Sequence, residues 1–343
     1  MEHRDRVFLE AVSIMRKACP VFNYVKRSDG SQFPIFARCL PHIIALHRNY
    51  HESVPLIKVN LQFADVLRDA GNYGTIGGNS TLSVPMLRTG MEICQILPNS
   101  LAVQRQLCNI MAALQHILQG RGTAGRTEAL QMALRIRELR FQEMQGVPRD
   151  QWAEADIVNW GRGTVDLGCA LVQLNRIEEG KERFEEGIEL YSQYEAFKIR
   201  LFHARSLHVR TLAIMQSKAE TREQAEATIK FIEGELGQSN YLTLQTTSYS
   251  GHALFTIGDV DRSCELHKDM FEQYLQVDGN NAHTTLGSQY CLAVCFQRKG
   301  LLKEARYVQG AARFMPKKKR NNSGLLIILL GIDNTSPKFW KSE

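Results

Sequence analysis

The sequence predicts an all-α protein, a right-handed superhelical solenoid of about six antiparallel helix pairs. First, a unit recurs without repeating its letters: a helix, a turn that often holds glycine or asparagine, and a second helix with small residues about two turns apart. Second, the turns recur at intervals of 49, 55, 43, 40 and 42 residues. Third, few stretches alternate apolar and polar residues, which argues against a β-sheet. The predicted turn residues are Gly71, Gly120, Asn175, Lys218, Gly258 and Gly300.

Residues 1–52 predict two helices that lead into the first pair. Apolar residues follow helical spacing from Phe8 to Cys19. Pro20 ends this stretch, because proline cannot continue the hydrogen-bond ladder of a helix. A second apolar helical stretch covers about residues 34–48.

The pairs follow one another from about residue 54 to residue 316. The first contains a small insertion at 74–80, and the second a glycine-rich insertion at 120–127 before a helix at 128–141. The fourth pair is weaker, with its second helix at 222–236. Small residues suit places where helices cross closely, and glycine or asparagine at a turn tolerates the left-handed conformation that ends a helix. The residues predicted to be small for packing are Gly168, Gly251 and Ala293 within pairs, and Gly187 and Ala312 between pairs.

These units resemble tetratricopeptide repeats (TPRs). That family has Leu-Gly in the first helix, Gly-Asp-Tyr at the turn, alanines in the second helix and a proline after it. The matching residues are Leu167, Gly168, Gly258, Asp259, Ala305, Ala312 and Pro316. The interval of about 40 residues departs from the family's about 34. It resembles the longer variant of kinesin light chains and of the sensor arms of fungal signalling NTPases.

The N-terminal residues resemble the end of the helical or winged-helix linker in fungal NACHT/NB-ARC-type (STAND) NTPases. The similarity rests on Phe8–Val12, Cys19-Pro20 and Cys39–Ile43. It implies a lead-in at 1–52, a repeat array at 54–316 and a tail at 317–343, without the upstream NTPase domain. The chain would then be a stand-alone sensor arm that self-associates or regulates a full-length relative.

The net charge of +6 gathers in the tail. Residues 313–343 hold seven lysines and arginines against Asp333 and Glu343, a net +5, so the remaining 312 residues carry only about +1. A nucleic-acid surface on the body is therefore disfavoured. The four cations Lys317, Lys318, Lys319 and Arg320 resemble a nuclear-import signal; the alternative is a solvated cap on the last helix. We expect a cytoplasmic protein, with nuclear import as the alternative.

The sequence argues against a membrane span and against a metal. The longest apolar run, Leu325–Leu330, is far shorter than the ~20 residues that a span needs. The eight cysteines form no C-x-x-C pair, and Cys291 and Cys295, four residues apart, have no matching His/Cys pair nearby in the sequence. We expect buried free thiols and no metal site.

A nucleotide-binding enzyme is the least favoured alternative. Residues 120–127 fit the pattern of a phosphate loop, except that Arg126 replaces the lysine and a helix precedes the loop in place of a strand. The spacing of His42, His47 and His51 favours a capping or surface role over a metal. We therefore expect no cofactor and no catalytic residue.

The TPR resemblance implies that first helices line a groove for a protein or peptide. By position, the implied contacts are Arg162, Val165, Cys169, Arg205, His208, Gln245, Ser248, His252, Phe255, Tyr290, Val294 and Arg298. This mixture fits a segment that is partly acidic and partly apolar. Chaperone C-terminal tails are disfavoured, because the slots for lysine and asparagine hold other residues. The leading hypothesis is a non-catalytic interaction scaffold, and a homo-oligomer is a further expectation.

Overall fold

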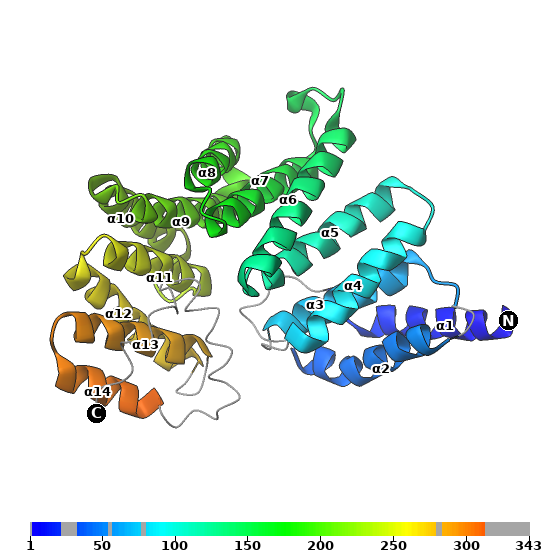
Figure 1. Ribbon diagram of the computed structural model, residues 1–343, viewed down its shortest axis with the longest axis horizontal. Coiled ribbons are helices and arrows are strands. Elements are labelled where there is room, and N and C mark those ends of the chain that lie inside the picture. The colour runs from blue at the N-terminus through cyan, green and yellow to red at the C-terminus, as the bar shows by residue number, and fades with distance from the viewer. Residues whose placement is uncertain (1, 22–32, 54–56, 77–79, 279–282, 313–343) are drawn as a thin grey trace. The chain divides into compact units, whose positions relative to one another are not determined.

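The computed structural model describes residues 2–21, 33–53, 57–76, 80–278 and 283–312. Within these ranges the chain forms fourteen α-helices and two one-turn 3₁₀ helices, η2 and η3, and no β-strand (Figure 1). The all-α class is confirmed, and the architecture is a TPR-like helical solenoid. The bounds are α1 Glu2–Ala18, α2 Phe33–Glu52, α3 Leu61–Ile76, α4 Ser80–Ile96, α5 Leu101–Leu118, α6 Gly122–Met144, η2 Arg149–Gln151, α7 Glu154–Gln173, α8 Ile177–Ser192, η3 Glu195–Phe197, α9 Lys198–Ile214, α10 Lys218–Leu236, α11 Tyr241–Thr256, α12 Val260–Asp278, α13 His283–Arg298 and α14 Leu302–Ala312.

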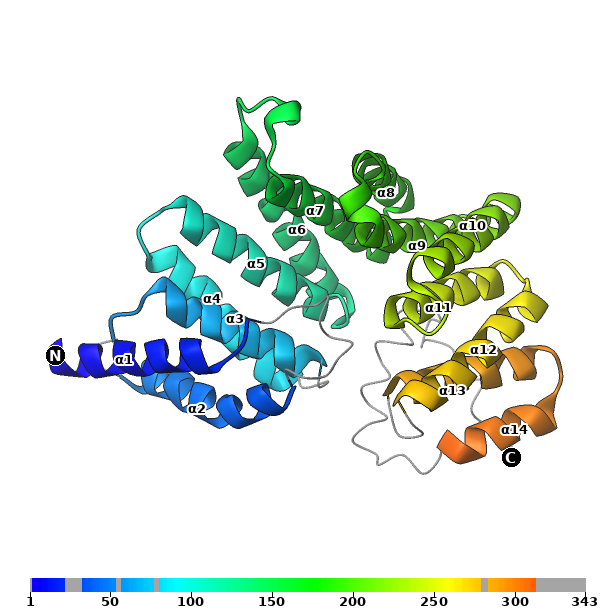
Figure 2. The same cartoon turned by 180° about the vertical axis from the view of Figure 1, so that it is seen from behind.

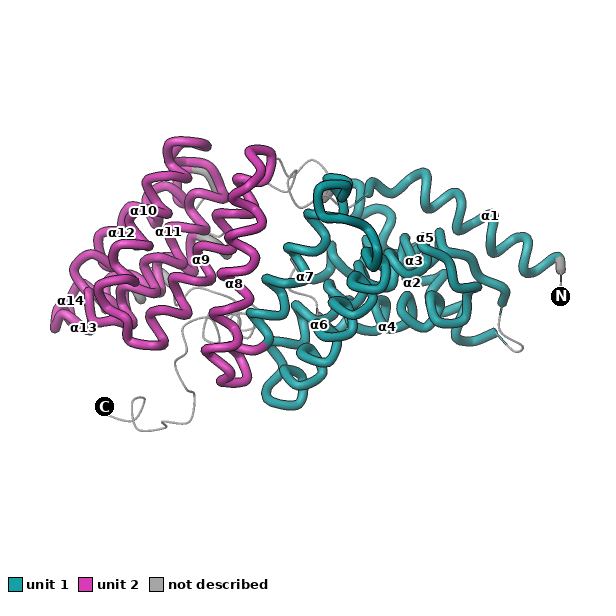
Figure 3. The backbone as a smooth tube through the Cα atoms, turned by 90° about the horizontal axis from the view of Figure 1, so that it is seen from above, with its two compact units in different colours: residues 1–170 teal, residues 171–343 magenta. Residues whose placement is uncertain are grey.

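The chain divides into two compact units, residues 1–170 and residues 171–343 (Figure 3). Each unit is described by itself below. The division falls inside α7, so the residues of this helix up to Ala170 belong to unit 1.

Unit 1 has a continuous apolar core that begins with the two lead-in helices. The rings of Phe8 in α1 and Phe63 in α3 meet edge to face, with centroids 5.1 Å apart. Ile110 and Leu114 of α5 belong to the same buried cluster. Helices α1 and α2 therefore pack as part of this unit, while the resemblance of residues 1–52 to a linker stays a prediction.

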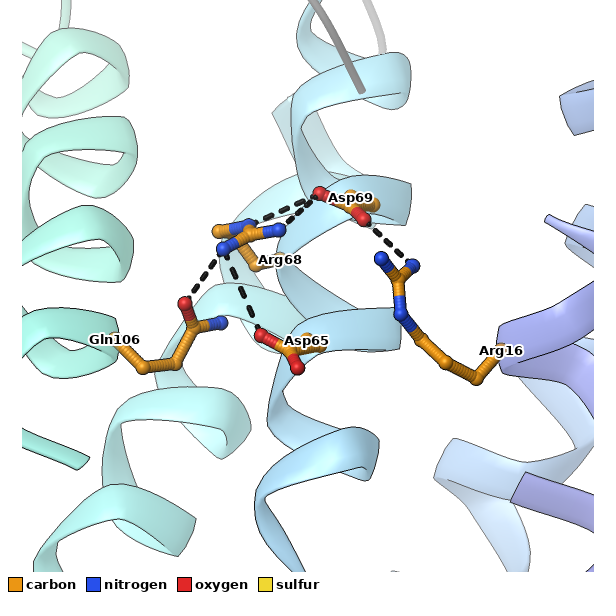
Figure 4. Close-up of polar contacts among 5 residues, drawn as sticks. All are labelled: Arg16, Asp65, Arg68, Asp69 and Gln106. Carbon is orange, nitrogen blue, oxygen red and sulfur yellow. Dashed lines mark hydrogen bonds and ion pairs between the residues drawn. The ribbon is translucent and has the colours of Figure 1, made fainter. Parts of the chain in front are cut away.

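A buried ionic network joins three helices of unit 1 (Figure 4). Asp69 of α3 accepts hydrogen bonds from Arg16 of α1 at 3.0 Å and from Arg68 at 2.8 Å. Arg68 also donates to Gln106 of α5 at 2.6 Å and pairs with Asp65 at 3.6 Å. Burial raises the pKa of the Asp69 carboxyl, and the two guanidinium groups oppose that shift. The network thus fixes α1 and α5 against α3.

Unit 2 alternates first helices (α9, α11, α13) with second helices (α10, α12, α14), as Figure 2 shows from behind. Consecutive helices pack against each other from α8 to α14, and α9 also packs against α11. Val209 of α9, Ala225 of α10, Leu254 of α11 and Leu266 of α12 share one buried cluster. Each pair therefore buries its apolar face against the next pair.

The turns confirm several sequence predictions. Asn175, Gly258 and Gly300 have φ values of 63°, 89° and 76°, the left-handed conformation expected at the end of a first helix. At the fourth turn the positive φ of 60° falls on Gln216, and Lys218 is already the first residue of α10.

Two predicted interruptions are wrong. Gly71 lies inside α3, and its lack of a side chain lets α4 approach: a Cβ added there would lie 2.7 Å from Cγ of Leu87. The segment 120–127 is no insertion before the helix either, because α6 begins at Gly122 and not at residue 128. A Cβ added at Gly125 would lie 2.5 Å from the carbonyl oxygen of Leu118, so this glycine allows α6 to start against the end of α5.

No helix in the part of the chain that the structure describes is long and apolar enough to cross a membrane. The Leu325–Leu330 run and the cations from Lys317 to Arg320 lie outside the described residues. The prediction of nuclear import therefore stays a prediction.

Candidate functional site

In unit 2, acidic residues are distributed unevenly between the first and the second helices. The three first helices α9, α11 and α13 contain no aspartate or glutamate. Their cations are Lys198, Arg200, Arg205, Arg210 and Arg298. Helix rows of one sign produce a local potential of that sign. These helices therefore favour a partner that carries negative charge.

Helices α8, α10 and α12 carry a net negative charge. Helix α8 has six glutamates against two cations, α10 has five against three, and α12 has five carboxylates against two cations. Some of these carboxylates pair with cations of neighbouring helices: Lys198 of α9 contacts Glu235 of α10 at 3.0 Å. The carboxylates are thus segregated along unit 2: most of them lie on α8, α10 and α12, and α9, α11 and α13 have none.

A polar and aromatic cluster connects α9 with α11. The guanidinium carbon of Arg210 lies 5.3 Å from the centroid of the Tyr249 ring, in a cation–π contact. Gln245, one turn before Tyr249, donates a hydrogen bond to the Tyr249 hydroxyl at 3.2 Å. All three side chains are half-buried. They provide a guanidinium group, an amide and an aromatic ring that are held in place before a partner arrives.

The next first helix, α13, adds Tyr290, Val294 and Arg298. Tyr290 and Val294 are half-buried and Arg298 is exposed. Burial raises the pKa of the Tyr290 hydroxyl, so this side chain is a neutral phenol at pH 7. The set of charged, aromatic and aliphatic groups on α9, α11 and α13 suits recognition of a peptide that is both acidic and apolar.

Three residues implied by the TPR resemblance are buried and do not line an accessible surface. The exposed fractions of Val165, His208 and His252 are 3%, 8% and 5%. His208 faces back towards α8, with its Nε2 3.6 Å from Glu185, and burial lowers its pKa. His252 faces Cys291 inside the unit. The position of a residue along a repeat therefore did not predict which side of its helix faces the interior.

The other implied contacts stay candidates with different surroundings. The Arg205 guanidinium carbon lies 5.5 Å from the centroid of the Phe231 ring in α10. Burial lowers the pKa of the Arg205 guanidinium group. Ser248 and Phe255 are half-buried. Arg162, which pairs with Asp166 at 3.6 Å, and Cys169 belong to unit 1 and are considered apart from unit 2.

Sequence reasoning missed Arg210 and Tyr249. A signal for them was present, because the absence of acidic residues from residues 198–214, 241–256 and 283–298 is visible in the sequence. Charge was summed over the whole body of the chain, where acidic second helices cancel basic first helices. Counting charge per predicted helix reveals the pattern.

Unit 1 carries a separate apolar hollow of about 480 Å³ formed by α6, Trp152 and the first half of α7. The rings of Trp152 and Trp160 meet edge to face at 5.7 Å, and the Arg137 guanidinium carbon lies 5.4 Å from the Trp160 ring. Leu134 and Phe141 are exposed at its rim. This hollow can accept an apolar side chain.

Two of the three histidines of α2 form a hydrogen-bonded group with α4. His47 Nε2 and His51 Nε2 lie 2.9 and 2.8 Å from the hydroxyl oxygen of Thr89, and 3.2 Å from each other. The pKa of His47 is lowered, mainly by its burial and to a smaller extent by the charge of His51. All eight cysteines are free and seven are buried, as expected.

No model of a known protein family matches the sequence. No curated protein sequence matches it either. Solved structures with related folds include the apo form of RapI, with a TM-score of 0.58 and 10% identity over 84% of this chain and 92% of RapI. A Rap protein complexed with Competence and Sporulation Factor has a TM-score of 0.59 and 9% identity over 95% of this chain and 80% of that one.

Aspartyl phosphate phosphatase F from Bacillus subtilis is a third similar structure. Its TM-score is 0.55, with 11% identity over 90% of this chain and 69% of that chain. At these identities the similarity shows the fold alone. The chain therefore shares the architecture of TPR-like helical repeat proteins.

Proposed function

We propose that this chain is a non-catalytic protein-interaction scaffold that binds an acidic, partly apolar segment of a partner protein on α9, α11 and α13. The observation that carries this proposal is the complete absence of carboxylates from these three helices, which hold five lysines and arginines. Arginine forms bidentate bonds with carboxylates, and half-buried tyrosines add contact area at a low entropic cost.

The comparisons support a binding role at the level of architecture. A Rap protein with this fold has been solved in a complex with Competence and Sporulation Factor. A stack of helix pairs presents a long face to a partner, which suits an extended segment. For this chain, the acidic chemistry of the segment is inferred from its own first helices.

A charge-reversal experiment tests the proposal. The full-length protein carrying Arg210→Glu and Arg298→Glu is compared with a control carrying Lys230→Glu and Lys268→Glu, which makes the same change in net charge on exposed positions of α10 and α12. Partners are recovered by co-purification at increasing salt, since surface charge interactions weaken as salt rises. We expect the first variant to lose partners that the control retains. Equal recovery from both variants would reject these helices as the binding face.

The role of sensor arm of a fungal STAND NTPase is a finer proposal that rests on the pattern in residues 1–52. It predicts self-association, which light scattering on the purified chain measures directly. A nucleotide-binding role is not proposed, because six of the eight residues from 120 to 127 lie in α6.

A further inference from the structure

Three residues that are far apart in the sequence meet inside unit 2. His252 of α11, His267 of α12 and Cys291 of α13 each direct a ligand atom to one place, and these atoms all lie within 4.8 Å of one another. His252 Nε2 is 3.1 Å from Cys291 Sγ, and the two imidazole centroids are 4.9 Å apart. Two imidazoles and a sulfur atom therefore share one small volume.

This cluster is buried and not fully satisfied. The exposed fractions of His252, His267 and Cys291 are 5%, 1% and 5%. Within the described residues, Nδ1 of each histidine is buried without a hydrogen-bond partner. A buried nitrogen without a hydrogen-bond partner destabilises the folded protein, because it has lost its contacts with water. Two neighbouring imidazoles with unpaired buried nitrogens therefore require an explanation, and a ligand-binding role provides one.

The backbone of α11 makes room for one of the rings. A Cβ added at Gly251 would lie 3.0 Å from Nε2 of His267. Gly251 was predicted to be small because two helices cross there, and the structure shows that the space holds an imidazole. The glycine lets the outer end of the His267 ring from α12 approach the helix that supplies His252.

We propose that His252, His267 and Cys291 form a buried site for a soft monovalent metal ion, Cu(I). Thiolate and imidazole are the ligands that soft first-row ions prefer. Net charge selects the ion: one thiolate neutralises Cu(I), whereas it would leave Zn(II) with an excess positive charge in an interior where unpaired charge is costly. Binding releases the Cys291 thiol proton to solvent, because the ligand is the thiolate.

Binding brings the three ligand atoms, now within 4.8 Å of one another, closer together around one ion. Metal bonds of about 2.0 Å to nitrogen and about 2.3 Å to sulfur place two ligand atoms of one ion about 3.5 Å apart. The 3.1 Å separation of His252 Nε2 and Cys291 Sγ is already close to that value. The bound ion would tie α11, α12 and α13 together, linking two successive helix pairs.

Anaerobic titration of the full-length, reduced protein with Cu(I) in competition with a chromophoric Cu(I) chelator measures the site. We expect one tightly bound Cu(I) per chain, and an X-ray absorption spectrum with one sulfur and two nitrogen neighbours. A rise in the unfolding temperature should accompany binding, because the ion binds the folded state. A spectrum with sulfur neighbours alone would overturn the proposal, since it would point to the other cysteines.

Matched variants locate the ion. Cys291→Ala should weaken binding by roughly 100-fold or more, because loss of even an outer-shell partner costs ~10–100-fold. Cys264→Ala removes another buried cysteine of unit 2 and should leave binding unchanged. Equal affinities of the two variants would overturn the site. If Cys291→Ala fails to fold by circular dichroism, the absorption spectrum of the unaltered protein decides. Preference of these three residues for Zn(II) over Cu(I) would overturn the assignment of the ion.

Discussion

Asp69 is the residue on which the ionic network of unit 1 depends. Its side chain is 1% exposed and bonds to two arginines, one of them from α1, 53 residues earlier in the chain. Sequence reasoning found the helix that contains Asp69 but not its burial, because neither Arg16 nor Gln106 is near it in the sequence. Partners brought together by tertiary packing leave no periodic signal.

Asp69→Ala should destabilise the protein by about 3–5 kcal/mol, because it leaves Arg16 and Arg68 largely buried without their carboxylate. Glu10→Ala is the control, since Glu10 pairs with Arg6 at 3.9 Å on an exposed surface. The control should change stability by less than about 1 kcal/mol. Urea denaturation measures both free energies of unfolding. Similar values for the two variants would show that the network does not stabilise unit 1.

The His47, His51 and Thr89 group predicts a loss of stability in acid. The pKa of His47 lies below its ordinary value of 6.5 in the folded chain, so the unfolded chain binds more protons between these two pKa values. The contribution of neutral His47 to the free energy of unfolding is complete above about pH 6.5. It falls as the pH is lowered from there towards the pKa of the folded chain. His47→Gln should give a shallower loss of stability between pH 7 and 5 than the unaltered protein. Parallel pH profiles would contradict this account.

At the scale of elements, glycine has two roles that the sequence does not separate. Gly258 and Gly300 end helices with positive φ, as predicted. Gly71 has the same neighbours as a turn, Ala70 and Asn72, yet it lies within α3, where Leu87 of α4 fills the space beside it. The interval between pairs was therefore predicted well. The end of α3 was not, because glycine is favoured both at a turn and where two helices pack closely.

Replacing two helical glycines with alanine should produce opposite effects. Gly71→Ala places a methyl group against the fully buried Leu87 and should destabilise the protein by about 1–3 kcal/mol, beyond the ~1 kcal/mol that alanine gains in helix propensity. Gly234→Ala in α10 meets no atom within 4 Å and should stabilise the protein by about 0.5–1 kcal/mol. Thermal unfolding with calorimetry compares them. A stabilising Gly71→Ala would show that α3 and α4 are not closely packed there.

At the scale of the whole molecule, the sequence predicted the fold class, which the structure confirms, while the binding face and its contact residues are proposals. The repeat pattern identifies which helices are first in each pair, and these helices, α9, α11 and α13, carry the proposed site. The burial of His252 and His208 depends on the rotation of each helix, which is set by neighbouring pairs. The partner's identity depends on surface chemistry that the fold shared with Rap proteins does not fix.

The central claim, that α9, α11 and α13 bind the partner, is tested most directly by site-specific photo-crosslinking. p-Benzoylphenylalanine replaces Tyr249 or Tyr290 on first helices, and Lys230 or Lys268 on second helices as controls. After irradiation, mass spectrometry identifies the partner segment that is attached at each position. We predict that Tyr249 and Tyr290 positions capture the same segment, rich in aspartate and glutamate, and that the two control positions do not. Capture of that segment equally from Lys230 and Lys268, or capture of a basic segment at Tyr249, would contradict the account.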